Sequence, residues 1–311
     1  MRRILFAIVL LTTYYLLFTS PALADQTGSI TVVPSIVQLD LATDKPQAEI
    51  IYKNNTPQTV QLSFFASDFT QLEEGYKISF LSQKDAQNYQ YSLSSWVSFS
   101  STNLVLEPGQ SGNIIVFVSP DKLSPGGHYG TILAQIETKK DADKNLQIQG
   151  ILSSLIFVRT NTGREIEKGN IQTFQPIRSF FDFPQSMLLR FNNTGDTTLT
   201  PYGLIRIFDP LGHEVSRGIL NESSLIALPE TIRRFDVPLR SPSGFLLPGI
   251  YTGTISMHYG KQNTKTQSTV SFFSQGSIPV IPVAVIVLGL IVLFLKRKQL
   301  ARGFAKKQQA D

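Results

Sequence analysis

Two short stretches decide the fold: "LEPGQSGNI" (residues 106–114) and its second copy "ALPETIRRF" (residues 227–235). In each, an apolar run ends at a proline turn and a new strand begins. Pro108 and Pro229 are 121 positions apart, and the later tyrosines Tyr129 and Tyr251 are 122 apart. Landmarks that recur in the same order indicate an internal repeat, so we predict two copies of one domain.

An earlier landmark, the Asn-Asn-Thr turn, shows that the first copy is longer. Asn54 pairs with Asn192 at an offset of 138, which exceeds the offset of the prolines by 17. We therefore expect about 17 extra residues between the first two landmarks of the first copy, within residues 68–96.

The local pattern between the two chain ends is β throughout. Runs rich in Val, Ile, Phe and Thr alternate with Pro, Gly and Asn, and no sustained 3.6-residue period occurs. The tyrosine of each copy is placed to cap the core and to reach a loop backbone, as in a tyrosine corner. We predict an all-β chain of two immunoglobulin-like β-sandwiches in tandem, residues 25–160 and 165–275; the alternative is a single large sandwich.

The amino-terminal end predicts a secretory signal. Arg2 and Arg3 precede an apolar run that leads to "TSPALA", a small-residue cleavage site, so residues 1–24 are predicted to be a signal peptide. An uncleaved anchor is the alternative.

The carboxyl-terminal end predicts a membrane span. Residues 278–295, from Ile278 to Leu295, are uninterruptedly apolar and would extend about 27 Å as a helix, close to the thickness of a hydrocarbon core. Lys296, Arg297 and Lys298 open a basic tail, residues 296–311, that the positive-inside rule keeps in the cytoplasm. We therefore expect a single-pass plasma-membrane protein whose ectodomain lies outside; a buried core helix is the alternative.

Net charge excludes nucleic acid as a partner. The formal charge of +5 arises in the two terminal segments, because residues 25–277 hold 20 Lys and Arg against 22 Asp and Glu. The absence of cysteine favours a bacterial envelope protein over a eukaryotic secreted one.

The motif Leu228-Pro229-Glu230-Thr231 is four fifths of the sortase signal that attaches bacterial proteins to the cell wall. Ile232 stands where that signal needs glycine, and 46 residues separate Thr231 from Ile278. Since Pro229 is also the repeat partner of Pro108, we predict a turn and no covalent anchoring.

Together, "IYKNNT", "LVLEPGQSGNIIVFVSP", "GGHYGTI", "ALPETIRRF" and "LPGIYTGTI" resemble the WxL-interacting proteins of Gram-positive bacteria. That resemblance implies a peptidoglycan-binding-like immunoglobulin domain, a second immunoglobulin-like domain and one transmembrane helix. Periplasmic pilus chaperones share the two-sandwich plan but lack the anchor. The predicted function is a membrane-anchored bacterial surface binding or adhesion module that contacts cell-wall polymer, such as peptidoglycan, or another surface protein. The alternative is a structural or accessory subunit of a larger envelope membrane complex.

No residue pattern points to catalysis. The three histidines, His128, His213 and His258, stand alone, and no G-x-S-x-G occurs. We predict no enzymatic activity, no metal and no cofactor.

The best candidate ligand site is "NYQYSLSSW" (residues 88–96), inside the extra segment. Tyr89, Tyr91 and Trp96 are predicted to form an aromatic platform for the apolar face of a sugar. Placement of Trp96 in the core, and strand addition at an exposed sheet edge, are the alternatives.

Overall fold

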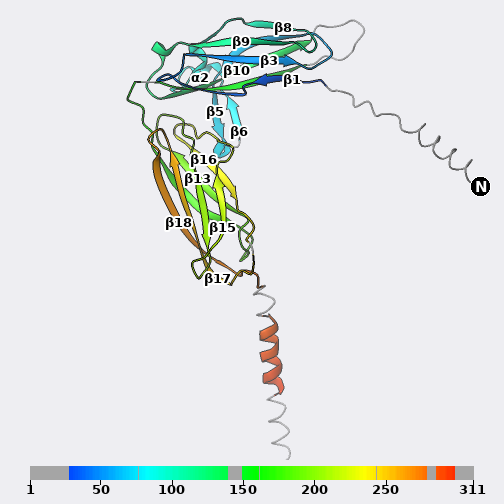
Figure 1. The fold of residues 1–311 in the computed structure, drawn as a ribbon, viewed down its shortest axis with the longest axis vertical. Coiled ribbons are helices and arrows are strands. Elements are labelled where there is room, and N and C mark those ends of the chain that lie inside the picture. Colours follow the sequence, from blue (N-terminus) through cyan, green and yellow to red (C-terminus); the bar gives the residue numbers. More distant parts are fainter. Residues whose placement is uncertain are drawn as a thin grey trace, which may run out of the picture.

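The computed structural model describes residues 28–75, 77–138, 149–160, 162–242, 244–278 and 285–297. The chain is mostly β structure, as the sequence predicts. Its sheets form two groups, each around its own apolar core, with the long axes of the groups set at an angle (Figure 1).

The first group of strands contains two sheets. One has the order β1-β3-β9-β7, and the other has the order β2-β11-β10-β4-β8. Only β2 and β11 run parallel among the paired strands of this group. The strands are β1 (Ile30–Val33), β2 (Ile36–Asp40), β3 (Gln47–Asn54), β4 (Val60–Ser67), β7 (Val97–Phe99), β8 (Asn103–Leu106), β9 (Ser111–Val118), β10 (Gly127–Thr138) and β11 (Gln149–Arg159).

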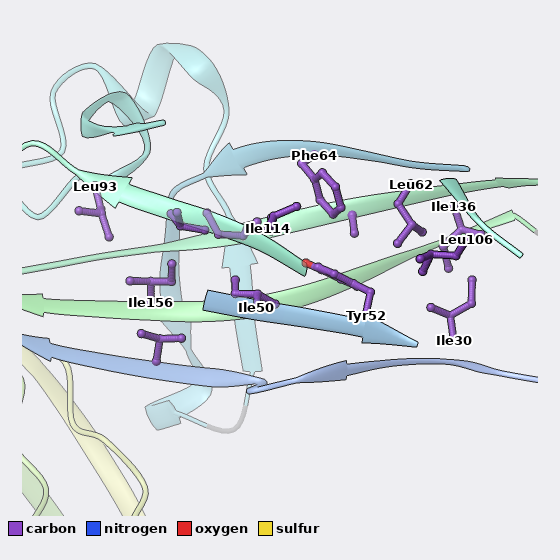
Figure 2. Close-up of a cluster of buried hydrophobic side chains, with 14 of the residues drawn as sticks. Ile30, Ile50, Tyr52, Leu62, Phe64, Leu93, Leu106, Ile114, Ile136 and Ile156 are labelled. Atoms are coloured by element: carbon purple, nitrogen blue, oxygen red, sulfur yellow. The ribbon is translucent and has the colours of Figure 1, made fainter. Parts of the chain in front are cut away.

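The core of this group lies between its two sheets. Alternating residues of each strand point inward, as the burial of Ile50 and Tyr52 on β3 and of Ile114 and Val116 on β9 shows. Figure 2 shows Ile50, Tyr52 and Ile114 in one cluster with Leu62 and other side chains of the opposite sheet. The chain passes from one sheet to the other at the cis peptide bond Val33-Pro34.

The second group repeats this plan with sheets of the orders β12-β13-β16 and β15-β14-β17-β18. Strand β13 alternates strictly, burying Met187, Leu189 and Phe191, and these meet Ile255 and Met257 of β17. The strands are β12 (Gly169–Ile177), β13 (Ser186–Asn193), β14 (Tyr202–Phe208), β15 (Glu214–Leu220), β16 (Thr231–Pro238), β17 (Gly249–Tyr259) and β18 (Thr264–Ser274).

An insertion between β4 and β7 distinguishes the first group, in the region where the repeat offsets predict extra residues. It contains a two-stranded hairpin and short helical turns, and the hairpin projects toward the second group (Figure 1). Its elements are β5 (Phe69–Leu72), η1 (Glu73–Gly75), β6 (Lys77–Phe80), α2 (Gln83–Ala86) and η2 (Ser94–Trp96); η3 (Pro120–Lys122) follows β9.

A fully buried asparagine holds the first turn of each group in the same way. The side-chain amide of Asn54 donates to the carbonyls of Gln58 at 2.8 Å and Leu106 at 3.0 Å. Asn193 donates to the carbonyls of Thr197 at 2.8 Å and Ala227 at 3.0 Å. The structural partner of Asn54 is therefore Asn193, and the predicted pairing with Asn192 is wrong by one residue.

The two repeated tyrosines differ. The hydroxyl of Tyr251 donates to the carbonyl of Leu247 at 2.6 Å, which is the predicted contact with a loop backbone. The hydroxyl of Tyr129 instead meets that of Tyr89 in the insertion.

The predicted membrane anchor is corrected. A helix covers residues 285–297, and among the residues that the structure describes no helix is both long and apolar enough to cross a membrane. The predicted single-pass span from Ile278 to Leu295, followed by Lys296 and Arg297, is therefore not supported. Residues 279–284 of that predicted span, the predicted tail from Lys298 onward and the predicted signal peptide, residues 1–24, lie outside the described residues.

We expect Asn193→Ala to lower the free energy of unfolding by about 2–4 kcal/mol, because two buried carbonyls lose their donor. Chemical denaturation of the variant measures this. Asn192→Ala is the matched control, since the neighbouring side chain is half-buried and points to the other face of β13. Equal losses for both variants would contradict the role of Asn193.

Candidate functional site

The loop that carries Tyr89 and Tyr91 is organised by one buried carboxylate. Asp68 is 1% exposed and accepts hydrogen bonds from the hydroxyls of Ser92 and Ser94 at 2.6 and 2.7 Å. The backbone N–H groups of Leu93 and Ser94 also donate to it, both at 2.8 Å. A buried charge requires such partners, so these bonds determine where the chain runs between η2 and α2.

The two predicted tyrosines pack into an aromatic cluster. The Tyr91 ring stacks on Tyr129 with centroids 5.9 Å apart, and the Tyr89 ring meets both rings edge-on. Phe69 and Phe157 complete the cluster on the side of the first sandwich. Burial of Tyr91 to 7% exposure leaves little of its ring for a ligand in this arrangement.

Trp96 is not part of this cluster. It is half-buried in η2, and the Lys122 ammonium lies over its ring at 5.7 Å. The structure therefore brings Tyr89 and Tyr91 together and places Trp96 in a separate environment. A ligand-binding role for the three residues stays a prediction.

The turn around Leu228-Pro229-Glu230-Thr231 covers the aromatic cluster from the second sandwich. Ile226 and Leu228 are buried against it, with 8% and 2% exposure. Glu230 has a positive φ of 56°, and β16 begins at Thr231, so the motif is a turn, as predicted. Its apolar residues join the two sandwiches.

The hairpin β5–β6 adds polar contacts to this junction. Glu74 at its tip forms an ion pair with Arg190 on β13. The hydroxyl of Thr231 donates to the side-chain carbonyl of Gln71 at 3.0 Å. The inserted segment of the first sandwich therefore braces the second.

A second set of contacts lies beside the linker, around a cavity of about 310 Å³. Arg159 pairs with Glu167, and Lys261 pairs with Asp40. Although partial burial opposes it, the hydrogen bond from Lys261, supported by the Ala42 N–H, holds the pKa of Asp40 below its usual range. The cations of this cavity are thus matched by carboxylates within the chain.

One stretch of sheet edge is uncovered, toward the end of β11 that lies away from this junction. Strand β11 pairs with β10 over its whole length, whereas β2 pairs only with Leu155–Arg159. The Leu155 N–H donates to the Ser35 carbonyl at 2.9 Å, away from β10. Because backbone groups alternate in direction along a strand, those of Ile151 and Ser153 also point away from β10. Within the described residues, neither has a backbone partner on that side.

Apolar side chains surround this uncovered edge on the outer face of the sheet. Ile151 is 60% exposed, Ile36 is 50% exposed and Phe65 is 41% exposed. Leu133 of β10 is buried between the neighbouring strands, because it pairs with Ser153 on one side and with Phe65 on the other. An unpaired edge next to exposed apolar side chains is a template for strand pairing. The sequence "ILSSLIF" (residues 151–157) contains Ile151 and Ser153, but its pattern does not reveal which strand lacks a neighbour.

The residues that the structure describes provide no evident metal site. Over the described ranges, His, Cys, Asp and Glu form no group of three or more that could hold a metal ion. His128 is buried, and its two ring nitrogens face the carbonyls of Ser92 at 3.0 Å and Ser124 at 2.9 Å, which makes it part of the scaffold around the Asp68 loop.

Alkaline pH should weaken the junction. Burial raises the pKa of Tyr91 to about 12, and burial also raises the pKa of Tyr89. A phenol whose pKa is higher in the folded state favours folding below the unfolded value of about 10. We expect the free energy of unfolding to fall as pH rises from about 10 to 12.

Denaturation at a series of pH values measures this dependence. Replacing Tyr89 and Tyr91 by Phe should reduce the slope of this dependence, and part of it should remain, because burial also raises the pKa of Tyr129 and that of Tyr52. An unchanged slope in the double variant would contradict the assignment.

No protein-family model and no curated protein matches this chain. Solved structures similar to it include the YadV chaperone, with a TM-score of 0.38 and 8% identity over 78% of this chain and 99% of that one. The class 5 fimbriae chaperone CfaA has a TM-score of 0.39 and 8% identity over 79% and 99%. The E. coli chaperone DraB has a TM-score of 0.36 and 11% identity over 80% and 98%.

These findings correct the predicted family and function. The resemblance to WxL-interacting proteins is not supported, since no family model matches the chain. The predicted role as a membrane-anchored surface module that contacts cell-wall polymer is not supported either, because no described helix is able to span a membrane. The same finding argues against the alternative, a subunit of an envelope membrane complex. The absence of enzymatic activity stays a prediction.

Proposed function

We propose that this chain is a non-enzymatic protein-binding module that holds an extended segment of a partner polypeptide by strand addition. The partner strand would lie along the uncovered part of β11, residues 149–154, at the end of this strand away from the junction of two immunoglobulin-like sandwiches. Holding an exposed strand of another polypeptide is a chaperone-like role.

The observation that carries the proposal is the incomplete pairing of β11. Its neighbour β2 pairs only with Leu155–Arg159, so the backbone groups of Ile151 and Ser153 point to a side where the described residues provide no partner strand. A partner strand would hydrogen-bond to these groups, each bond contributing about 0.5–1.5 kcal/mol. Strand addition uses the backbone for affinity and needs no particular side chain.

The side chains around the edge support the same role. Ile151, Phe65 and Ile36 provide exposed apolar surface where the alternate side chains of an added strand would lie. These three side chains carry no charge, so this surface selects for apolar content more than for charge.

The junction limits movement between the sandwiches. The buried aromatic cluster, the hairpin contacts and the linker ion pairs all connect the same two bodies. The second sandwich is therefore held in one orientation relative to β11.

Substitution of Ser153 by proline tests the proposal. Proline removes the N–H that faces the open side and leaves the bonds to β10 in place. We expect short extended peptides with alternating apolar residues to bind the full chain, and Ser153→Pro to weaken this binding about tenfold or more, as measured by calorimetry. Equal affinity in the variant would overturn the proposal.

Hydrogen exchange gives an internal control. The amides of Ile151 and Ser153 should exchange rapidly in the free chain and become protected by bound peptide, whereas the Leu155 amide is bonded in both states. Ile151→Asp should reduce peptide binding. Val105→Asp, at a 47% exposed position on the opposite edge of the same sheet, should not.

A further inference from the structure

The outer face of the sheet β15-β14-β17-β18 is hollowed into a groove of about 880 Å³. Its floor follows the cross-strand register: Tyr202 lies opposite His258, which lies opposite Lys265. The next row on this face contains Leu204, Ser256 and Gln267, and the row after it Arg206, Thr254 and Thr269. The strand addition proposed for β11 uses none of these residues.

We propose that this groove binds an acidic oligosaccharide. Aromatic rings, a field of hydroxyl and amide groups, and cations all line the same concave surface, and a sugar acid presents apolar ring faces, dense hydroxyls and carboxylates.

An aromatic pair forms one end of the groove. Tyr202 is 51% exposed, and its ring stacks on that of His258 with centroids 5.8 Å apart and planes 28° apart. The Tyr202 hydroxyl donates to Asn263 Oδ1 at 2.6 Å, which holds the ring upright. A rigid, exposed ring of this kind offers apolar contact to a sugar at a low cost in conformational entropy.

The floor supplies both donors and acceptors. Ser256, Gln267, Thr254 and Thr269 carry hydroxyl or amide groups on adjacent strands, which lie about 4.8 Å apart. The only hydrogen bond that links two of these side chains, Gln267 to Ser256 at 3.4 Å, is long. These groups can therefore bond to ligand hydroxyls without breaking a strong internal contact.

Charge selects an acidic ligand. Arg206 and Lys265 line the groove, and among the lining residues the only carboxylate is Glu222. Glu214, outside the lining, lies 2.8 Å from Arg217 but 3.8 Å from Arg206, so its stronger pairing is with Arg217. Arg206 and Lys265 stand in different rows of the register, which suits two carboxylates along a chain of sugar acids.

Calorimetry with three probes on the full chain tests the proposal: an oligogalacturonate, a neutral oligoglucoside of equal length and an oligoglutamate peptide. We expect the oligogalacturonate alone to bind clearly. Tyr202→Ala and Lys265→Glu should each weaken this binding about tenfold or more. Lys53→Glu, on β3 of the first sandwich, is the charge-matched control and should have no effect.

Each other outcome overturns the proposal. Equal binding of oligoglutamate, unaffected by Tyr202→Ala, would show simple charge attraction. Equal binding of the neutral oligoglucoside would remove the role of Arg206 and Lys265, and no binding of oligogalacturonate at millimolar concentration would exclude the site. Thermal unfolding of both groove variants checks that they fold, and Ser153→Pro should leave oligogalacturonate binding unchanged.

Discussion

The arrangement of the two sandwiches depends on the burial of one charge, the Asp68 carboxylate. Its four hydrogen bonds hold the loop that carries Tyr89 and Tyr91 against Tyr129. Only with those rings in place does the first sandwich offer an apolar surface that Leu228 of the second can cover. An uncompensated buried carboxylate would cost several kcal/mol, so the loop has little freedom to adopt another path.

The junction combines features that both sandwiches share with features that only one of them has. Asn54 and Asn193 show that both sandwiches use the same buried amide to tie a turn to a neighbouring loop. The insertion exists only in the first sandwich, and its hairpin supplies the contact between Glu74 and Arg190. The turn at Pro229 corresponds by sequence to the one at Pro108, but it packs against a neighbouring domain. A shared framework therefore acquired an asymmetric interface through one inserted segment.

Sequence reasoning succeeded where the information is local. Alternating apolar residues, proline turns and the repeat predicted an all-β chain and the turn at Leu228-Pro229-Glu230-Thr231. The predicted repeat partner of Asn54 was wrong by one residue, Asn192 in place of Asn193. Adjacent strand residues face opposite sides, and the sequence alone does not say which of two neighbouring asparagines points inward. It failed more widely for the family, since the quoted motifs are strand and turn patterns that many β-sandwiches share. The membrane anchor expected from the apolar run 278–295 is not supported by the described helix.

The candidate sites also combine features that local sequence predicts with features that only tertiary contacts produce. By itself, the sequence determined the two-copy β pattern, the position of the insertion and the aromatic content of residues 88–96, because strand alternation and turn chemistry act between near neighbours. Only the tertiary structure decided that Tyr91 packs at a domain junction, that β2 leaves Ile151 and Ser153 uncovered, and that Tyr202 and Lys265 share a groove. These features arise from contacts between residues distant in the chain, and their free energies depend on burial and pairing that no local pattern encodes.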